Sequence, residues 1–278
     1  MGLFFHPNQA APSGLRLTGF ARYTEVLERN FKKLFLTGLM TLLFFLPFGI
    51  GAAYAVLSSS LLVMLLAGVF GGILAGPALS CMYDAVFRGL RDAAPKFWRD
   101  YVHAWKQNFR SSIIPGILTC VLLGFDIFMA MLFYYSAAFP GFGTIALYLF
   151  SVLALTMVCS IVWPQIVLFD QPLVQTLKNS LLFILRYFPK ALGAALLQIL
   201  YWGALLLLLP WTALLLPLTG FWFILYTANF LLYNTLNGCF EIEDKIAAAF
   251  PKQAVFYETD EAWITRKQKE AQNNQGKK

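Results

Sequence analysis

Six long apolar segments alternate with shorter polar segments along the chain. They run over about 34–56, 61–86, 113–135, 144–169, 191–209 (an end at 216 stays open) and 221–240. Each is close to the roughly 20 residues that a helix needs to cross a bilayer. The runs are continuous and do not alternate as barrel strands do, and a helix satisfies its own backbone in lipid. The pattern predicts an all-α integral membrane protein with six transmembrane helices.

The basic residues lie on alternate sides of these segments. The stretch before the first segment has five, the loop after the second has six, the loop after the fourth has three and the stretch after the sixth has seven, which together are all 21 Lys and Arg residues. The connections near 57–60, 136–143 and 217–220 have none. Because Lys and Arg accumulate in cytoplasmic loops, we expect a multi-pass cell-membrane protein with both termini in the cytoplasm.

This topology divides the chain into three parts. We expect a cytoplasmic segment with an amphipathic helix at 1–33, a transmembrane domain at 34–240 and a cytoplasmic tail at 241–278. The two cytoplasmic loops of the domain, at about 88–112 and 170–190, are each expected to contain an amphipathic interfacial helix.

The low share of charged residues agrees with a membrane protein, and the positive net charge indicates which partners to expect. Charged residues make up 13% of the chain, compared with roughly 25% in soluble proteins. The net charge of +7 is explained by the topology and by attraction to anionic lipid headgroups. The expected partner is therefore the lipid bilayer and not nucleic acid.

The first cytoplasmic loop contains the stretch FWRDYVHAWKQNFR. Wound as a helix, this stretch has an apolar side and a polar side. The apolar side consists of Phe97, Trp98, Tyr101, Val102, Trp105 and Phe109, and Asn108 is the one polar residue among them. The polar side consists of Arg99, Asp100, His103, Lys106, Gln107 and Arg110. Aromatic residues opposite basic ones are typical of an interfacial helix. It is either an elbow that only orients two spans or a docking surface for a partner. The candidate docking residues are Phe97, Arg99, Tyr101, Trp105, Lys106, Phe109 and Arg110.

The second loop has a weaker version of the pattern, with Gln175, Lys178, Asn179 and Arg186 on one face.

Glycines recur at every fourth position of the second span, at Gly68, Gly72 and Gly76. Such a stripe leaves a smooth surface that another helix can approach closely. We expect it to pack against another span of the same chain, with a homo-oligomer interface as the alternative.

Few polar side chains fall within the spans. Asp126 is the one acid well inside a span, and acids there are costly enough to suggest a function by default. Gln198, Asn234 and Asn237 are the other candidates for an intramembrane polar site. A structural role for Asp126 and a place in a polar cavity both stay open.

Motifs of catalysis and metal binding are absent from the sequence. It has no Walker motif, no HExxH and no paired carboxylates within one span. The two histidines and four scattered cysteines form no metal-ligand cluster. We therefore expect no enzymatic activity, no cofactor and no metal.

Two stretches resemble a known family. LPFGIGAA at 46–53 is similar to the end of the first span in the YesL-type family of bacterial membrane proteins. GPALSCMYDAVFRGLRDAAPKFWRDYVHAWKQNFRSSIIPG at 76–116 resembles that family's central signature. The resemblance extends from about 22 to 238 and is specific in the central block, whereas the loop after the fourth span diverges.

The resemblance implies a polytopic protein of undetermined biochemical function and supplies no catalytic residues. Members tend to be encoded beside carbohydrate-uptake ABC transporter genes in Gram-positive bacteria. We therefore expect a non-enzymatic accessory membrane protein of a transport system, with permease subunits of a carbohydrate ABC importer as partners. The alternative is a small-molecule transporter or substrate-binding membrane subunit in its own right, which would need a polar cavity at Asp126.

Overall fold

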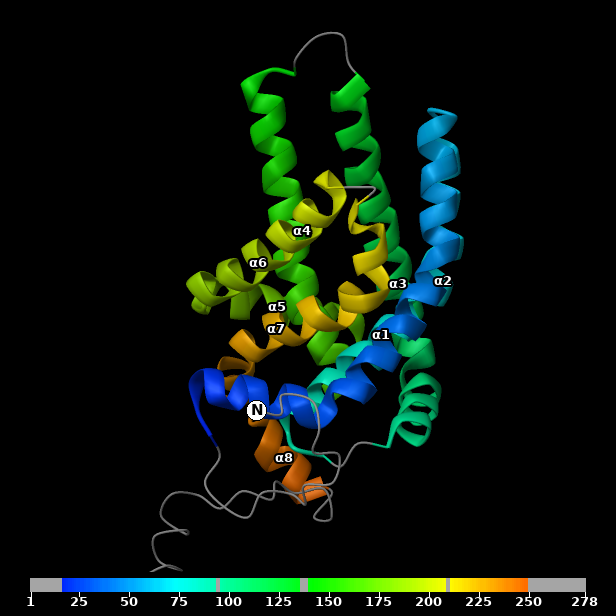
Figure 1. The fold of residues 1–278 in the computed structure, drawn as a ribbon. Coiled ribbons are helices and arrows are strands. Elements are labelled where there is room, and N and C mark those ends of the chain that lie inside the picture. The colour runs from blue at the N-terminus through cyan, green and yellow to red at the C-terminus, as the bar shows by residue number, and fades with distance from the viewer. Residues whose placement is uncertain (1–16, 94–95, 136–139, 209–210, 250–278) are drawn as a thin grey trace, which may run out of the picture. The chain divides into compact units, whose positions relative to one another are not determined.

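The computed structural model describes residues 17–93, 96–135, 140–208 and 211–249, and within these ranges its regular structure is helical (Figure 1). The helices are α1 (Gly19–Leu57), α2 (Leu61–Leu90), α3 (Phe97–Tyr135), α4 (Phe142–Leu168), α5 (Leu173–Arg186), α6 (Phe188–Leu207), the 3-10 helix η1 (Trp211–Leu214), α7 (Leu215–Phe240) and α8 (Ile242–Ala249). Six of them, α1, α2, α3, α4, α6 and α7, are long and apolar enough to cross a membrane. The predicted all-α fold with six spans is confirmed at this level.

Two helices extend beyond the predicted spans. α1 begins at Gly19 and not near 34, and α3 begins at Phe97 and not near 113. The amphipathic stretch of the first loop is therefore the beginning of α3 and not a separate helix. The physical reason is local, because no Gly or Pro lies between 97 and 112 to end a helix there. In the second loop α5 is a separate helix and ends where Tyr187 leaves helical geometry.

The connection between the last two spans differs from the prediction. The sequence predicts the connection near 217–220, whereas η1 precedes α7 and the residues from Leu215 onward are already helical. The backbone of α7 leaves helical geometry at Gly220. The Tyr201 hydroxyl of α6 lies 3.1 Å from the Gly220 carbonyl oxygen and 2.9 Å from Oγ1 of Thr219. A neighbouring helix thus satisfies a backbone group that the break releases, as membrane helices require.

The chain forms two compact units. The small unit has 17–31, 88–93 and 236–249 as its described residues, and the large unit has 32–87 and the described residues from 96 to 235. In the large unit α4 packs against α3, α5 and α6, and Figure 1 shows α3 and α4 running beside each other. α4 is therefore a central element of this unit.

The glycines of α2 lie against α3 in the large unit. A Cβ added at Gly68, Gly72 or Gly76 would lie 2.8, 2.5 or 2.4 Å from backbone atoms of Val121, Ile117 and Ser112 respectively. Gly116 faces them from α3, where a Cβ would lie 2.5 Å from the Gly76 Cα. The two backbones meet at a distance that only glycine allows, as in small-residue packing of membrane helices. The contact is within one chain.

In the small unit a buried acid binds two arginines of the N-terminal segment. Asp92 has a left-handed backbone (φ 66°) and a buried carboxylate. Arg22 donates to it at 2.6 Å and to the Leu90 carbonyl oxygen at 3.2 Å, and Arg29 forms a second ion pair with it. Two of the five basic residues before the first span therefore neutralise a buried charge of the protein.

Candidate functional site

The first four turns of α3 present three distinct faces. The face that packs on the protein consists of four residues at intervals of four, Asp100, Ala104, Asn108 and Ser112. This spacing keeps side chains on one side of a helix. The sequence prediction that Asp100 lies on the polar, water-facing side of the helix is wrong, because the Asp100 side chain is buried. The placement of Asn108 on the less polar side agrees with its burial.

The aromatic face is partly covered by the protein itself. The rings of Phe97, Tyr101, Trp105 and Phe109 follow one another at centroid distances of 5.8, 6.1 and 6.2 Å. Phe44 of α1 lies 4.8 Å from Trp105 between ring centroids. Tyr101 and Trp105, both candidate docking residues, are therefore half-buried and contribute to packing within the large unit.

A narrower apolar stripe stays exposed beside the aromatic ladder. It consists of Trp98, Val102 and Phe109, which are 63%, 42% and 38% exposed, and we call it the α3 stripe. Exposed basic side chains follow around the helix at Arg99, Lys106 and Arg110. The order of buried face, apolar stripe and basic face is typical of a helix at a membrane surface.

Asp100 forms a buried ion pair with α1. Its carboxylate accepts from the Lys33 ammonium at 2.9 Å and from the Lys96 backbone N–H at 3.1 Å. The side chains of Lys33 and Asp100 are both 5% exposed. Lys33 is therefore directed at this acid and not at lipid headgroups. The sequence signal that could have located the pair is the four-residue repeat of small or polar residues that includes Asp100.

The helix of the second loop repeats the three-face arrangement. α5 buries Thr176, Ser180, Phe183 and Ile184, and Ser180 accepts from the Gln165 side chain of α4 at 2.8 Å. Its exposed apolar side chains are Val174, Leu177, Leu181, Leu182 and Leu185. On the polar side, Asn179 donates to Gln171 at 2.9 Å and accepts from Gln175 at 3.0 Å. The buried face, made partly of hydroxyl residues, was not predicted.

The four intramembrane polar candidates do not form one site. Asp126 is buried and accepts from Ser151 at 3.2 Å, and Gln198 donates to Ser160 at 2.6 Å. Asn237 accepts from the Glu243 backbone N–H at the beginning of α8 (2.9 Å), and Asn234 is exposed. Among the described residues no hydrogen bond joins any two of the four candidates. Asp126, Gln198 and Asn237 each have a hydrogen-bond partner outside this set.

We expect the Gln198–Ser160 hydrogen bond to be an ordinary interhelical contact with a coupling free energy of about 0.6 kcal/mol. A double-mutant cycle of Gln198→Leu and Ser160→Ala, followed by unfolding in detergent, measures it. The control cycle combines Gln198→Leu with Ser151→Ala and should show no coupling, because Ser151 bonds Asp126 instead. A coupling well above this value would show that the pair belongs to a larger polar site.

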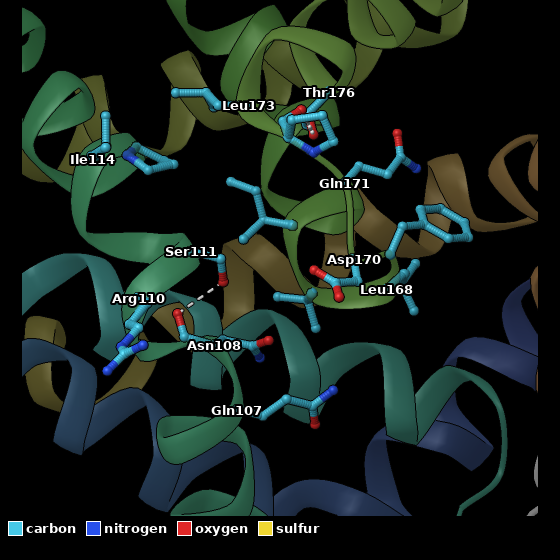
Figure 2. Close-up of a pocket in the computed structure, with 15 residues that line it drawn as sticks. Gln107, Asn108, Arg110, Ser111, Ile114, Leu168, Asp170, Gln171, Leu173 and Thr176 are labelled. Carbon is cyan, nitrogen blue, oxygen red and sulfur yellow. Dashed lines mark hydrogen bonds between the residues drawn. The ribbon is translucent and has the colours of Figure 1, made fainter.

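Two cavities lie in the large unit. One of about 410 Å³ is bounded by the 107–115 stretch of α3, the end of α4, the connection after it and the beginning of α5 (Figure 2). The other, of about 280 Å³, lies among Val56, Leu57, Ser59, Phe128, Met131, Leu132 and Tyr135. Neither is lined by Asp126, Gln198 or Asn234.

Neither the metal-binding side chains of the described residues nor a comparison with known proteins assigns a function to this chain. Within the described ranges no group of three or more His, Cys, Asp or Glu side chains could hold a metal ion. Cys81 and Cys120 are buried free thiols, and Cys120 belongs to a cluster of buried apolar side chains. Searches against protein-family models, curated proteins and solved structures found no match to this chain.

Proposed function

We propose that the protein is a non-enzymatic accessory membrane protein that binds a transport assembly. The version that we put forward for test is a carbohydrate ABC importer, and the contact is with its permease subunits. In this proposal both termini lie in the cytoplasm, as the distribution of all 21 Lys and Arg residues favours. The beginning of α3 and the whole of α5 then lie at the cytoplasmic membrane surface.

The observation that supports the proposal best is the exposed α3 stripe. Trp98 and Phe109 are large aromatic residues that the protein's own packing leaves 63% and 38% exposed, and Arg99 stands beside them with 71% of its side chain exposed. Aromatic residues and arginine are the types enriched at the energetic centres of protein interfaces. A face of this kind at the membrane surface suits a helix of a neighbouring membrane subunit.

The interior of the large unit favours this proposal over transport by the protein itself. A carrier needs polar groups that converge on a cavity near the middle of the membrane. Here Asp126 and Gln198 are bonded to separate serines, and neither described cavity includes them.

The test is affinity purification of the tagged full-length protein from native membranes at native expression, after mild cross-linking. We expect recovery of ABC permease subunits to fall at least about tenfold when Trp98→Ala and Phe109→Ala are combined. Truncation of the aromatic residues that dominate an interface typically lowers affinity by this much or more. The matched control combines Trp211→Ala and Phe70→Ala, which remove the same residue types at exposed positions of η1 and α2. The control should recover permease subunits as the unaltered protein does.

Two results would contradict the proposal. One is recovery of the unaltered protein without any permease subunit. The other is equal loss in both double variants, which would mean that aromatic residues act through membrane insertion and not through a specific surface.

A further inference from the structure

The larger cavity has features of a binding site that the accessory function does not use. One wall is the 107–115 stretch of α3, and the facing wall is the connection from Phe169 to Pro172 between α4 and α5 (Figure 2). Its volume of about 410 Å³ falls within the range of roughly 300–1,000 Å³ that is usual for small-molecule sites. The position, beside the first half of α3 and at the end of α4, is one that a lipid headgroup could reach.

Asn108 contributes a polar side chain to the cavity wall. The residue is 5% exposed, and its backbone oxygen accepts from the Ser111 and Ser112 hydroxyls. No hydrogen bond joins its side-chain amide to the described residues, so the amide is available to a ligand. A ligand in the cavity could accept from and donate to this amide.

The cavity also carries one cation and one anion. Arg110 belongs to the α3 wall and Asp170 to the facing connection (Figure 2). Both residues are exposed. The remaining polar groups of the wall, among them Gln107, Gln171 and Ser111, are neutral. An anionic ligand would face repulsion from Asp170, and a cationic ligand would face repulsion from Arg110. The complement to this wall is a ligand that carries both charges.

An apolar track leaves the cavity along α3. Ile114 lines the cavity and is 59% exposed, and Leu118 and Leu122 follow at intervals of one helical turn with about half of each side chain exposed. An acyl chain needs an apolar surface of this kind, which a free water-soluble zwitterion does not use. The track therefore favours a lipid over a soluble metabolite.

We propose that this cavity binds the headgroup of a zwitterionic phospholipid with a primary ammonium, of the phosphatidylethanolamine type. The phosphate accepts from the Arg110 guanidinium and the Asn108 amide, and the ammonium donates to the Asp170 carboxylate. An acyl chain lies along Ile114, Leu118 and Leu122. Binding of this lipid does not depend on whether the protein supports a transporter.

The test is native mass spectrometry of the delipidated full-length protein in detergent. It is titrated separately with phosphatidylethanolamine, phosphatidylglycerol, phosphatidylcholine and soluble glycerophosphoethanolamine. We expect phosphatidylethanolamine to bind at least about tenfold more tightly than phosphatidylglycerol, because only its ammonium forms a charge-assisted hydrogen bond with Asp170. Phosphatidylcholine should bind more weakly, since its quaternary ammonium has no N–H to donate.

Two variants separate the charges, and a third is the control. Asp170→Asn should reduce the ratio of the affinities for phosphatidylethanolamine and phosphatidylglycerol to about one. Arg110→Gln should weaken the binding of both lipids. Arg186→Gln removes an exposed arginine of α5 that does not line the cavity, and should change neither the affinity for the two lipids nor the preference between them.

Equal affinity of the unaltered protein for the two lipids would overturn the proposal, and so would an unchanged preference in a folded Asp170→Asn protein. Glycerophosphoethanolamine that binds as tightly as the lipid would show that the ligand is a free headgroup and not a membrane lipid.

Discussion

Replacing Gly72 or Gly76 with Ala is expected to destabilise the protein by about 1–3 kcal/mol, the usual cost of overpacking a close contact. The added methyl group would lie 2.5 Å from the Ile117 Cα in the first case and 2.4 Å from the Ser112 carbonyl oxygen in the second. These are backbone atoms, so no side-chain rotation relieves the overlap. The helices must separate along their whole contact, and unfolding in detergent followed by circular dichroism would measure the loss.

The matched control is Gly193→Ala in α6, where an added Cβ would have no neighbour within 4 Å. The same substitution is expected to stabilise there by roughly 0.5–1 kcal/mol, because Ala favours a helix more than Gly does. Opposite signs for one chemical change would identify close backbone packing as the cause. Equal effects at Gly76 and Gly193 would contradict the α2–α3 contact.

The second large effect is expected at the ion pair between α1 and α3. Lys33→Met keeps the length of the side chain but removes the charge beside the buried Asp100 carboxylate. Removal of one partner of a buried pair typically costs about 3–5 kcal/mol, because the remaining charge stays buried and loses its nearest opposite charge. The free energy of unfolding in detergent is again the measurement.

A double variant tests the cause of this loss. Combining Lys33→Met with Asp100→Leu should recover most of the stability, since an apolar pair of similar size often replaces a buried ion pair without cost. Lys106→Met removes an exposed charge of α3 that is not paired with Asp100, and should change stability by less than about 0.5 kcal/mol. A harmless Lys33→Met would mean that water or the Arg99 guanidinium, whose Nε lies 3.8 Å from Asp100, compensates the buried charge.

The spans could be predicted because membrane crossing depends on a local property, the length of an apolar run. The buried ion pairs could not, because they join residues far apart in the chain. Lys33 and Asp100 are 67 positions apart, and Arg22 and Asp92 are 70 apart. A helical-wheel projection of 97–110 places Asp100 with the charged residues, and only knowledge of the neighbouring helix reverses that placement.

Among the candidate sites, too, features within one helix could be predicted from the sequence, whereas features formed by two packed elements could not. The glycine stripe is a regular spacing within one helix, and its expected use in close packing required no knowledge of the partner. The larger cavity combines Asn108 and Arg110 with Asp170, which belongs to the connection after α4. Only the packing of α3 beside α4 brings these residues to one place, and the spacing of the sequence contains no sign of it.

The continuity of α3 has a geometric consequence. Gly116, where α3 meets the backbone of Gly76, is 19 residues from Phe97 and 19 from Tyr135, which is about 28 Å in each direction at the helical rise. The close backbone contact therefore divides α3 into two arms of equal length, and neither end of the helix is nearer to α2 at this point than the other.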